Sequence, residues 1–233
     1  AVTAFSRQQI VDALLSQTDA LRQADGYASI NWNFLPSAGA SLVHPHMQGL
    51  SDSCPTHIVD RYITASEQYR REQKRNYWEA VKEKEKSSDR YLFGDEILWS
   101  AHAVPVGERE VRGILPVSCI DELENYVDLL AAGILEVLSI YRKLGTHAFN
   151  MAIFFDKTDG DNGFSAFCSL ISLCMSSKTC CCTSSRPKST RVARMPAPRA
   201  AYSCVGCAGR LRAGRPGMRI VTGPWSVVSL SSG

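Results

Sequence analysis

The chain has 233 residues, and its 45% hydrophobic and 21% charged content is ordinary for a globular protein. It is long enough for one substantial hydrophobic core or two small ones. No apolar run approaches the roughly 20 residues that a membrane-spanning helix needs, so no membrane span is expected. The first residues lack a basic-then-apolar signal pattern, and we therefore expect a cytoplasmic protein rather than a secreted one.

Charge divides the chain into two unlike parts. All 23 acidic residues lie at or before Asp161. Of the 26 Lys and Arg residues, 16 lie before Asp161 and ten follow it. Residues 168–233 are rich in Cys, Ser and Arg and have no period that buries a face. Two interpretations stay open: a disordered basic tail, or a change of reading frame near residues 168–175. Nucleic acid is not an expected partner, because no aromatic residues alternate with these cations.

Hydrophobic periodicity predicts the elements of the first part. Ser6 and Gln9 form a capping-box pattern ahead of apolar residues at helical spacing. Gly94-Asp95 is typical of a turn between two antiparallel strands. Helices are expected at residues 7–23, 58–85 and 121–144, and strands at 27–35, 90–93, 96–103, 110–115 and 147–155. This order predicts an α+β fold with an antiparallel sheet.

The residues best suited to chemistry follow the first predicted strand. If the run around His44 continues as a strand, then His44, His46 and Gln48 project from one face at alternate positions. Residues 38–41, Ala-Gly-Ala-Ser, are small enough for a turn whose N–H groups approach an anion closely. Isolated histidines usually belong to a surface or a core, but this spacing favours a site. It predicts a phosphate cradle beside a histidine nucleophile.

Asn33, Gly39-Ala40-Ser41 and His44-Pro45-His46-Met47-Gln48 together resemble a known active-site segment, that of the galactose-1-phosphate uridylyltransferases. These enzymes are a branch of the histidine-triad superfamily. The Gly-Ala-Ser form is also similar to that of diadenosine-tetraphosphate phosphorylases and ADP-glucose phosphorylases. The resemblance implies a histidine-triad-like antiparallel sheet with packed helices. It also implies three parts: the end of a catalytic half at 1–57, a partial second half at 58–167, and an irregular tail at 168–233.

The resemblance implies a nucleotidyltransferase of galactose metabolism that moves UMP between sugar 1-phosphates through a covalent nucleotidyl-histidine. Its partners are then a nucleotide sugar, a sugar 1-phosphate and a second copy of the chain in a homodimer. His46 is implied as the nucleophile, because a neutral imidazole attacks an anionic phosphorus with less repulsion than a carboxylate does. A partner on its other nitrogen is expected to fix the tautomer. The residues implied to hold phosphate oxygens are Asn33, Gly39, Ala40, Ser41 and Gln48.

His44 is a candidate metal ligand, because the first histidine of this pair binds zinc in some members of the resembled family. Its partners there include an upstream Cys-x-x-Cys pair, and no such pair precedes His44 in this sequence. We therefore expect no definite cofactor, and a phosphate-binding or supporting role for His44. Two other functions stay open. One is an incomplete remnant that at most binds nucleotide, because the later His-x-His region of the family has no counterpart. The other is a dinucleoside-polyphosphate or ADP-sugar phosphorylase.

Overall fold

The computed structural model describes residues 5–40, 44–160, 162–173 and 219–222. The helices are α1 (Arg7–Arg22), α2 (His57–Gln73), α3 (Tyr77–Lys86) and α4 (Val127–Lys143), with 3-10 turns η1 (Pro36–Ala38) and η2 (Ile120–Tyr126). The strands are β1 (Tyr27–Phe34), β2 (Met47–Asp52), β3 (Tyr91–Phe93), β4 (Leu98–Ala101), β5 (Val111–Ile114), β6 (Ala148–Phe154), β7 (Phe167–Leu173) and β8 (Arg219–Thr222). Within these ranges, no helix has the length and apolar character needed to cross a membrane.

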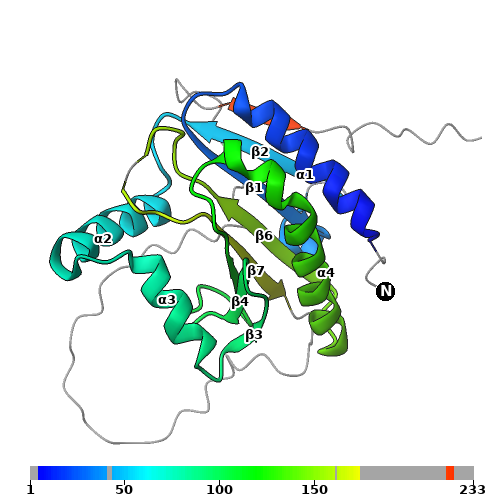
Figure 1. The fold of residues 1–233 in the computed structure, drawn as a ribbon. Coiled ribbons are helices and arrows are strands. Elements are labelled where there is room, and N and C mark those ends of the chain that lie inside the picture. Colours follow the sequence, from blue (N-terminus) through cyan, green and yellow to red (C-terminus); the bar gives the residue numbers. More distant parts are fainter. Residues whose placement is uncertain (1–4, 41–43, 161, 174–218, 223–233) are drawn as a thin grey trace, which may run out of the picture.

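The strands form one antiparallel sheet in the order β3-β4-β5-β7-β6-β1-β2-β8 (Figure 1). The sheet with its packed helices confirms the predicted α+β fold class. Strands from both sides of residue 57 lie in this sheet, with β6 next to β1. The division of the chain into two halves at that residue stays a prediction.

Helices cover both faces of the sheet. Helices α1 and α4 pack side by side on one face, over Trp32, Phe149 and Met151 (Figure 1). Helices α2 and α3 cover part of the other face, where Trp78 packs against Phe167. Strand β6 is buried at every position because it lies between the two helix layers.

The long helix predicted at 58–85 is wrong in one respect, because it is divided into α2 and α3. Lys74 ends α2 with φ 53°, in the left-handed region. The Asn76 side chain then accepts hydrogen bonds from the backbone N–H groups of Trp78 and Glu79 and so begins α3. The new helix direction places Trp78 in the core with only 2% of it exposed. Tertiary burial therefore outweighs a helical pattern that has no proline or glycine to interrupt it.

The predicted tail boundary at residue 168 falls inside β7. This strand pairs with β5 on one side and β6 on the other. Cys168 and Leu170 are fully buried, as expected for a central strand covered on both faces. The alternation that marks a half-exposed strand is consequently absent from this stretch. The rest of the predicted tail lies outside the described residues, apart from β8.

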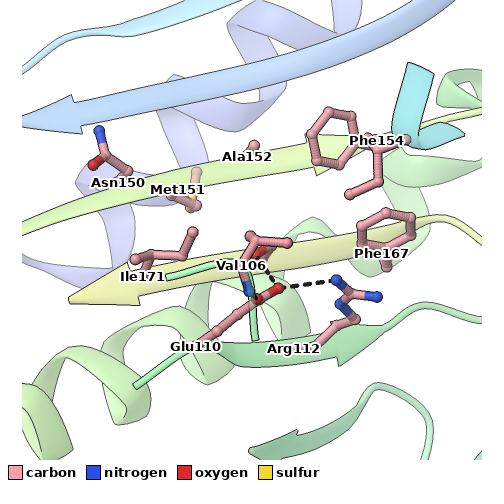
Figure 2. Close-up of a pocket in the computed structure, with 11 residues that line it drawn as sticks. Val106, Glu110, Arg112, Asn150, Met151, Ala152, Phe154, Phe167 and Ile171 are labelled. Atoms are coloured by element: carbon pink, nitrogen blue, oxygen red, sulfur yellow. Dashed lines mark hydrogen bonds and ion pairs between the residues drawn. The ribbon is translucent and has the colours of Figure 1, made fainter. Parts of the chain in front are cut away.

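A charged cluster is buried where β5 meets β7 (Figure 2). Arg112 Nη2 lies 2.9 Å from Glu110 Oε1, and the two side chains are 4% and 0% exposed. Ser169 Oγ donates to the same carboxylate, and the Val106 backbone N–H donates to its other oxygen. The guanidinium also stacks over the Phe167 ring at 4.6 Å. The Glu110 carboxylate is thus the counter-ion of a cation that has no access to bulk water.

The Glu110→Gln substitution is expected to lower the free energy of unfolding by about 3–5 kcal/mol, because it leaves the Arg112 charge buried without a counter-ion. Urea denaturation followed by circular dichroism measures the loss. The matched control is Glu108→Gln, which removes a half-exposed carboxylate 3.5 Å from Arg109. This control is expected to cost less than about 1 kcal/mol. Equal losses in the two variants would contradict the role given to the buried pair.

Helix α4 packs on β4 through a glycine. A Cβ added at Gly133 would lie 2.3 Å from Trp99 Nε1, which is much closer than any van der Waals contact. The Gly133→Ala substitution is therefore expected to destabilise the protein by about 1–3 kcal/mol, even though alanine is the better helix former. A double-mutant cycle with Trp99→Phe, measured by the same denaturation, should recover part of the loss. A Gly133→Ala variant as stable as the parent argues against this close contact.

Candidate functional site

The connection between β1 and β2 carries the predicted site. After β1, the turn η1 leads to Gly39, whose φ of 83° lies in the left-handed region that suits glycine. The chain is described again from His44, and β2 begins at Met47. The predicted phosphate ligand Ser41 lies outside the described residues.

The predicted strand through His44 is wrong, because His44 and His46 both precede β2 and only Gln48 lies in it. Pro45 explains the late start, since proline has no N–H for a strand ladder and its ring fixes φ. The two histidines therefore lie on the loop that enters the strand. Active groups are often found on such loops, at the end of a rigid element.

The sheet register shows on which side the motif lies. Trp32 of β1 is opposite Met47 of β2, and both side chains belong to the core beneath α1 and α4. Because side chains alternate along a strand, Asn33 and Gln48 face the other side of the sheet. Asn33 directly follows Trp32 and His46 directly precedes Met47, so both lie next to the last paired residues of the two strands. The structure thus places Asn33, His46 and Gln48 at one end of the β1–β2 pair.

The His46 ring makes a hydrogen bond that determines its tautomer. Its Nδ1 lies 3.0 Å from the backbone carbonyl oxygen of His44. A carbonyl oxygen only accepts, so the proton of the neutral ring resides on Nδ1 and the lone pair on Nε2. His44 makes a similar contact, with its Nδ1 3.1 Å from the Pro45 carbonyl. The expected partner for the other nitrogen of His46 is therefore a backbone carbonyl, and Nε2 is the atom available as a nucleophile.

The small-residue turn is closed by its own hydrogen bonds. The N–H of Gly39 donates to the Pro36 carbonyl at 3.0 Å, and that of Ala40 donates to the Leu35 carbonyl at 3.2 Å. These two N–H groups are therefore already used within the turn. Gly39 and Ala40 lack bulky side chains, so what they offer to a phosphate is space for a close approach.

One residue of the site was not predicted from the sequence. Asn150 of β6 is 8% exposed, and its Nδ2 donates to Asn33 Oδ1 at 2.5 Å and to the Ala38 carbonyl at 2.7 Å. It lies opposite Asn33 in the register of β6 and β1. A signal existed, because Asn150 is the single polar residue in the strand Ala148–Phe154. Its partner could not be read from the sequence, since 117 residues separate the two asparagines.

The described residues do not fit a zinc site at His44. A structural or catalytic zinc needs three or four protein ligands. No group of three or more His, Cys, Asp or Glu side chains within the described ranges could hold a metal. Burial raises the pKa of the Cys119 and Cys168 thiols, which disfavours the thiolate form that binds metals.

The His46 tautomer can be measured directly. In a long-range ¹H–¹⁵N correlation spectrum recorded above pH 8, we expect Nδ1 of His46 to carry the proton and Nε2 to give the signal of an unprotonated nitrogen, because the His44 carbonyl holds Nδ1–H. The His46→Ala variant assigns the signals by their loss. In the His44→Ala variant the pattern should persist, since the acceptor is a backbone atom. A proton on Nε2 would overturn the assignment.

Comparison with known proteins identifies the fold but not a sequence family. No protein-family model matches the chain. An uncharacterized protein of the archaeon Archaeoglobus fulgidus is 27% identical over 166 residues, which is 69% of this chain and 50% of the relative. The chain thus spans about half the length of that curated relative.

Several solved structures have the same fold. A uridylyltransferase matches with a TM-score of 0.65 and 17% identity, over 72% of this chain and 57% of its own. A GalT-like protein of Arabidopsis thaliana matches at 0.64 and 17%, over 74% and 61%. An ADP-glucose phosphorylase of the same plant, with bound ADP-glucose, matches at 0.63 and 16%, over 72% and 58%. The chain therefore has the α+β fold shared by uridylyltransferase, GalT-like and ADP-glucose phosphorylase structures, and spans about three fifths of each.

Proposed function

We propose that the chain carries the nucleotidyl-transfer site of a uridylyltransferase-like enzyme, which moves UMP between sugar 1-phosphates through a covalent bond to His46. The observation that carries the proposal is the hydrogen bond from His46 Nδ1 to the His44 carbonyl. When the ring is neutral, this hydrogen bond places its proton on Nδ1 and its lone pair on Nε2. A nucleophile for an anionic phosphorus needs that state.

The reaction has two displacements. In the first, the Nε2 lone pair attacks the α-phosphorus of a UDP-sugar and forms a P–N bond. The bond from that phosphorus to the bridging oxygen breaks, and the sugar 1-phosphate leaves with the electron pair. In the second, an oxygen of another sugar 1-phosphate attacks the same phosphorus and the P–N bond breaks, which regenerates neutral His46. No proton has to be removed from Nδ1 in either step.

The side chains beside His46 are assigned to the charge on the phosphoryl group. Gln48 faces the same side of the sheet as Asn33 and carries an amide donor for a non-bridging oxygen. Asn33 is assigned as a second amide donor. Gly39 and Ala40 are assigned to the wall of the phosphate site through the space that their small side chains leave, and the Ser41 hydroxyl is assigned as a further phosphate donor. His44 supplies its carbonyl to His46 rather than a metal ligand.

The shared fold supports this proposal, and one solved structure favours a second acceptor. The uridylyltransferase and the ADP-glucose phosphorylase match this chain almost equally, with TM-scores of 0.65 and 0.63. The first displacement is the same whether the acceptor in the second is a sugar 1-phosphate or inorganic phosphate. A phosphorylase is therefore the second candidate function, and the acceptor distinguishes the two.

An incomplete remnant is the third interpretation, because the later His-x-His region of the resembled family has no counterpart in this sequence. The chain covers 57–61% of three of the solved structures that share the fold. A chain that lacks part of the substrate site binds nucleotide but forms no covalent intermediate. The interpretation as a remnant therefore predicts binding without labelling.

Incubation with UDP-glucose radiolabelled at the α-phosphate is expected to leave label on the protein. The label should be lost in acid and retained in alkali, as a phosphoramidate requires. The His46→Ala variant should take up none, because it has no nucleophilic nitrogen. Scintillation counting of the precipitated protein is the measurement.

The matched control is His147→Ala, which removes an exposed histidine between α4 and β6 and should label like the parent. Chasing the labelled protein with galactose 1-phosphate or with inorganic phosphate tells transferase from phosphorylase by which compound removes the label. Label retained by His46→Ala would refute the nucleophile. A parent chain that binds UDP-glucose in calorimetry but takes up no label would establish the remnant.

A further inference from the structure

Asn150 holds two groups of the proposed site at once. Its side chain extends from β6, at the rim of the cavity shown in Figure 2. The single nitrogen Nδ2 reaches both Asn33 Oδ1, at 2.5 Å, and the Ala38 carbonyl oxygen, at 2.7 Å. Ala38 belongs to the turn that leads to Gly39. Asn150 therefore links the last part of β1 to the small-residue turn.

These contacts determine which way each amide points. A backbone carbonyl oxygen can only accept a hydrogen bond, so the Asn150 atom beside Ala38 must be the nitrogen. That same nitrogen touches Asn33, so Asn33 must present its oxygen. Both hydrogens of the Asn150 Nδ2 group are then used. The Asn33 Nδ2 group is consequently turned away from Asn150, with its two hydrogens available on the side of the sheet that carries the motif.

We infer that Asn150 is a positioning residue that orients the Asn33 amide as a donor toward the phosphate of the substrate. The inference rests on the proposed function, because it concerns how Asn33 meets an anion beside His46. Phosphate oxygens only accept hydrogen bonds, so an Asn33 amide in the opposite orientation would place oxygen against oxygen. Asn150 excludes that orientation without touching the substrate itself.

A purely structural role is the competing explanation, since Asn150 also satisfies the Ala38 carbonyl. The two explanations differ for the Asn150→Asp variant. A carboxylate at this position only accepts, so Asn33 turns its NH₂ group toward it and presents oxygen to the phosphate. A protonated carboxyl group has one hydrogen to donate, and when that hydrogen goes to Asn33 Oδ1 the original orientation of the Asn33 amide returns. The positioning role therefore predicts a labelling rate that is reduced at high pH and recovers at low pH. Loss of packing predicts a labelling rate that is reduced at every pH.

The test measures the rate of protein labelling by α-labelled UDP-glucose between pH 5.5 and 8. At each pH, the rate for the Asn150→Asp variant is divided by the rate for the parent. At pH 8 we expect the ratio to be about 10⁻², the usual effect of removing one donor from a developing negative charge. Burial raises the pKa of a carboxyl group, so protonation begins within this range. The ratio should rise at least about tenfold by pH 5.5, because the protonated group donates to Asn33 again.

The matched control is Asn76→Asp, which makes the same chemical change at the N-cap of α3. There the amide nitrogen donates to the Gly163 carbonyl, far from the motif in the fold. This control should label like the parent at every pH. An Asn150→Asp ratio that stays near one, or one that is low but independent of pH, would overturn the inference.

A second measurement needs no activity and separates this inference from the proposed function. In ¹H–¹⁵N spectra of the free protein, the side-chain NH₂ of Asn150 should exchange slowly with water and that of Asn33 rapidly. The Asn33→Asp and Asn150→Asp variants assign the two signals by their loss. Slow exchange at Asn33 with fast exchange at Asn150 refutes the orientation. The predicted pattern in a protein that takes up no label supports the orientation and refutes only the transfer reaction.

Discussion

The rest of the structure depends on the alternation of side chains along β1. This strand pairs with β2 on one side and β6 on the other. Ile30, Trp32 and Phe34 enter the core under α1 and α4, and none is more than 3% exposed. Each such burial contributes about 1.5–3 kcal/mol. A slip of one residue would place Trp32 on the polar face and Asn33 in the core, so the hydrophobic effect itself sets the register.

That register assembles the proposed site from distant parts of the chain. On one side of β1 it pairs Trp32 with Met47, so the loop with His44 and His46 enters β2 beside the end of β1 that carries Asn33. On the other side it places Asn150 directly opposite Asn33. The hydrogen bond between Asn33 and Asn150 is short-range, and it exists because apolar side chains on the opposite face hold β1 and β6 in alignment. Packing and chemistry thus use opposite faces of the same strands.

The face that carries the motif is itself divided. Toward β5 and β7 it is closed by α2 and α3, and the Glu110–Arg112 pair there is enclosed among aromatic rings. Glu110 stabilises the buried positive charge of Arg112, which is a structural role. Toward β2 the same face carries Asn33 and Gln48, and His44 and Pro45 provide the carbonyl groups that fix the two imidazoles. The enclosed charges and the proposed reactive groups therefore lie on different strands of one surface.

The sequence by itself determined what depends on local chemistry: the capping box of α1, strand β1, the turn at Gly94, and the motif from Asn33 to Gln48. It failed where distant partners decide. The division of the predicted helix between Lys74 and Asn76 follows from the burial of Trp78, and β7 lacks alternation because both its faces are covered. Only the tertiary structure could join Asn150 to Asn33 and define the amide orientation, because a hydrogen bond between residues 117 apart depends on strand register and leaves no local pattern.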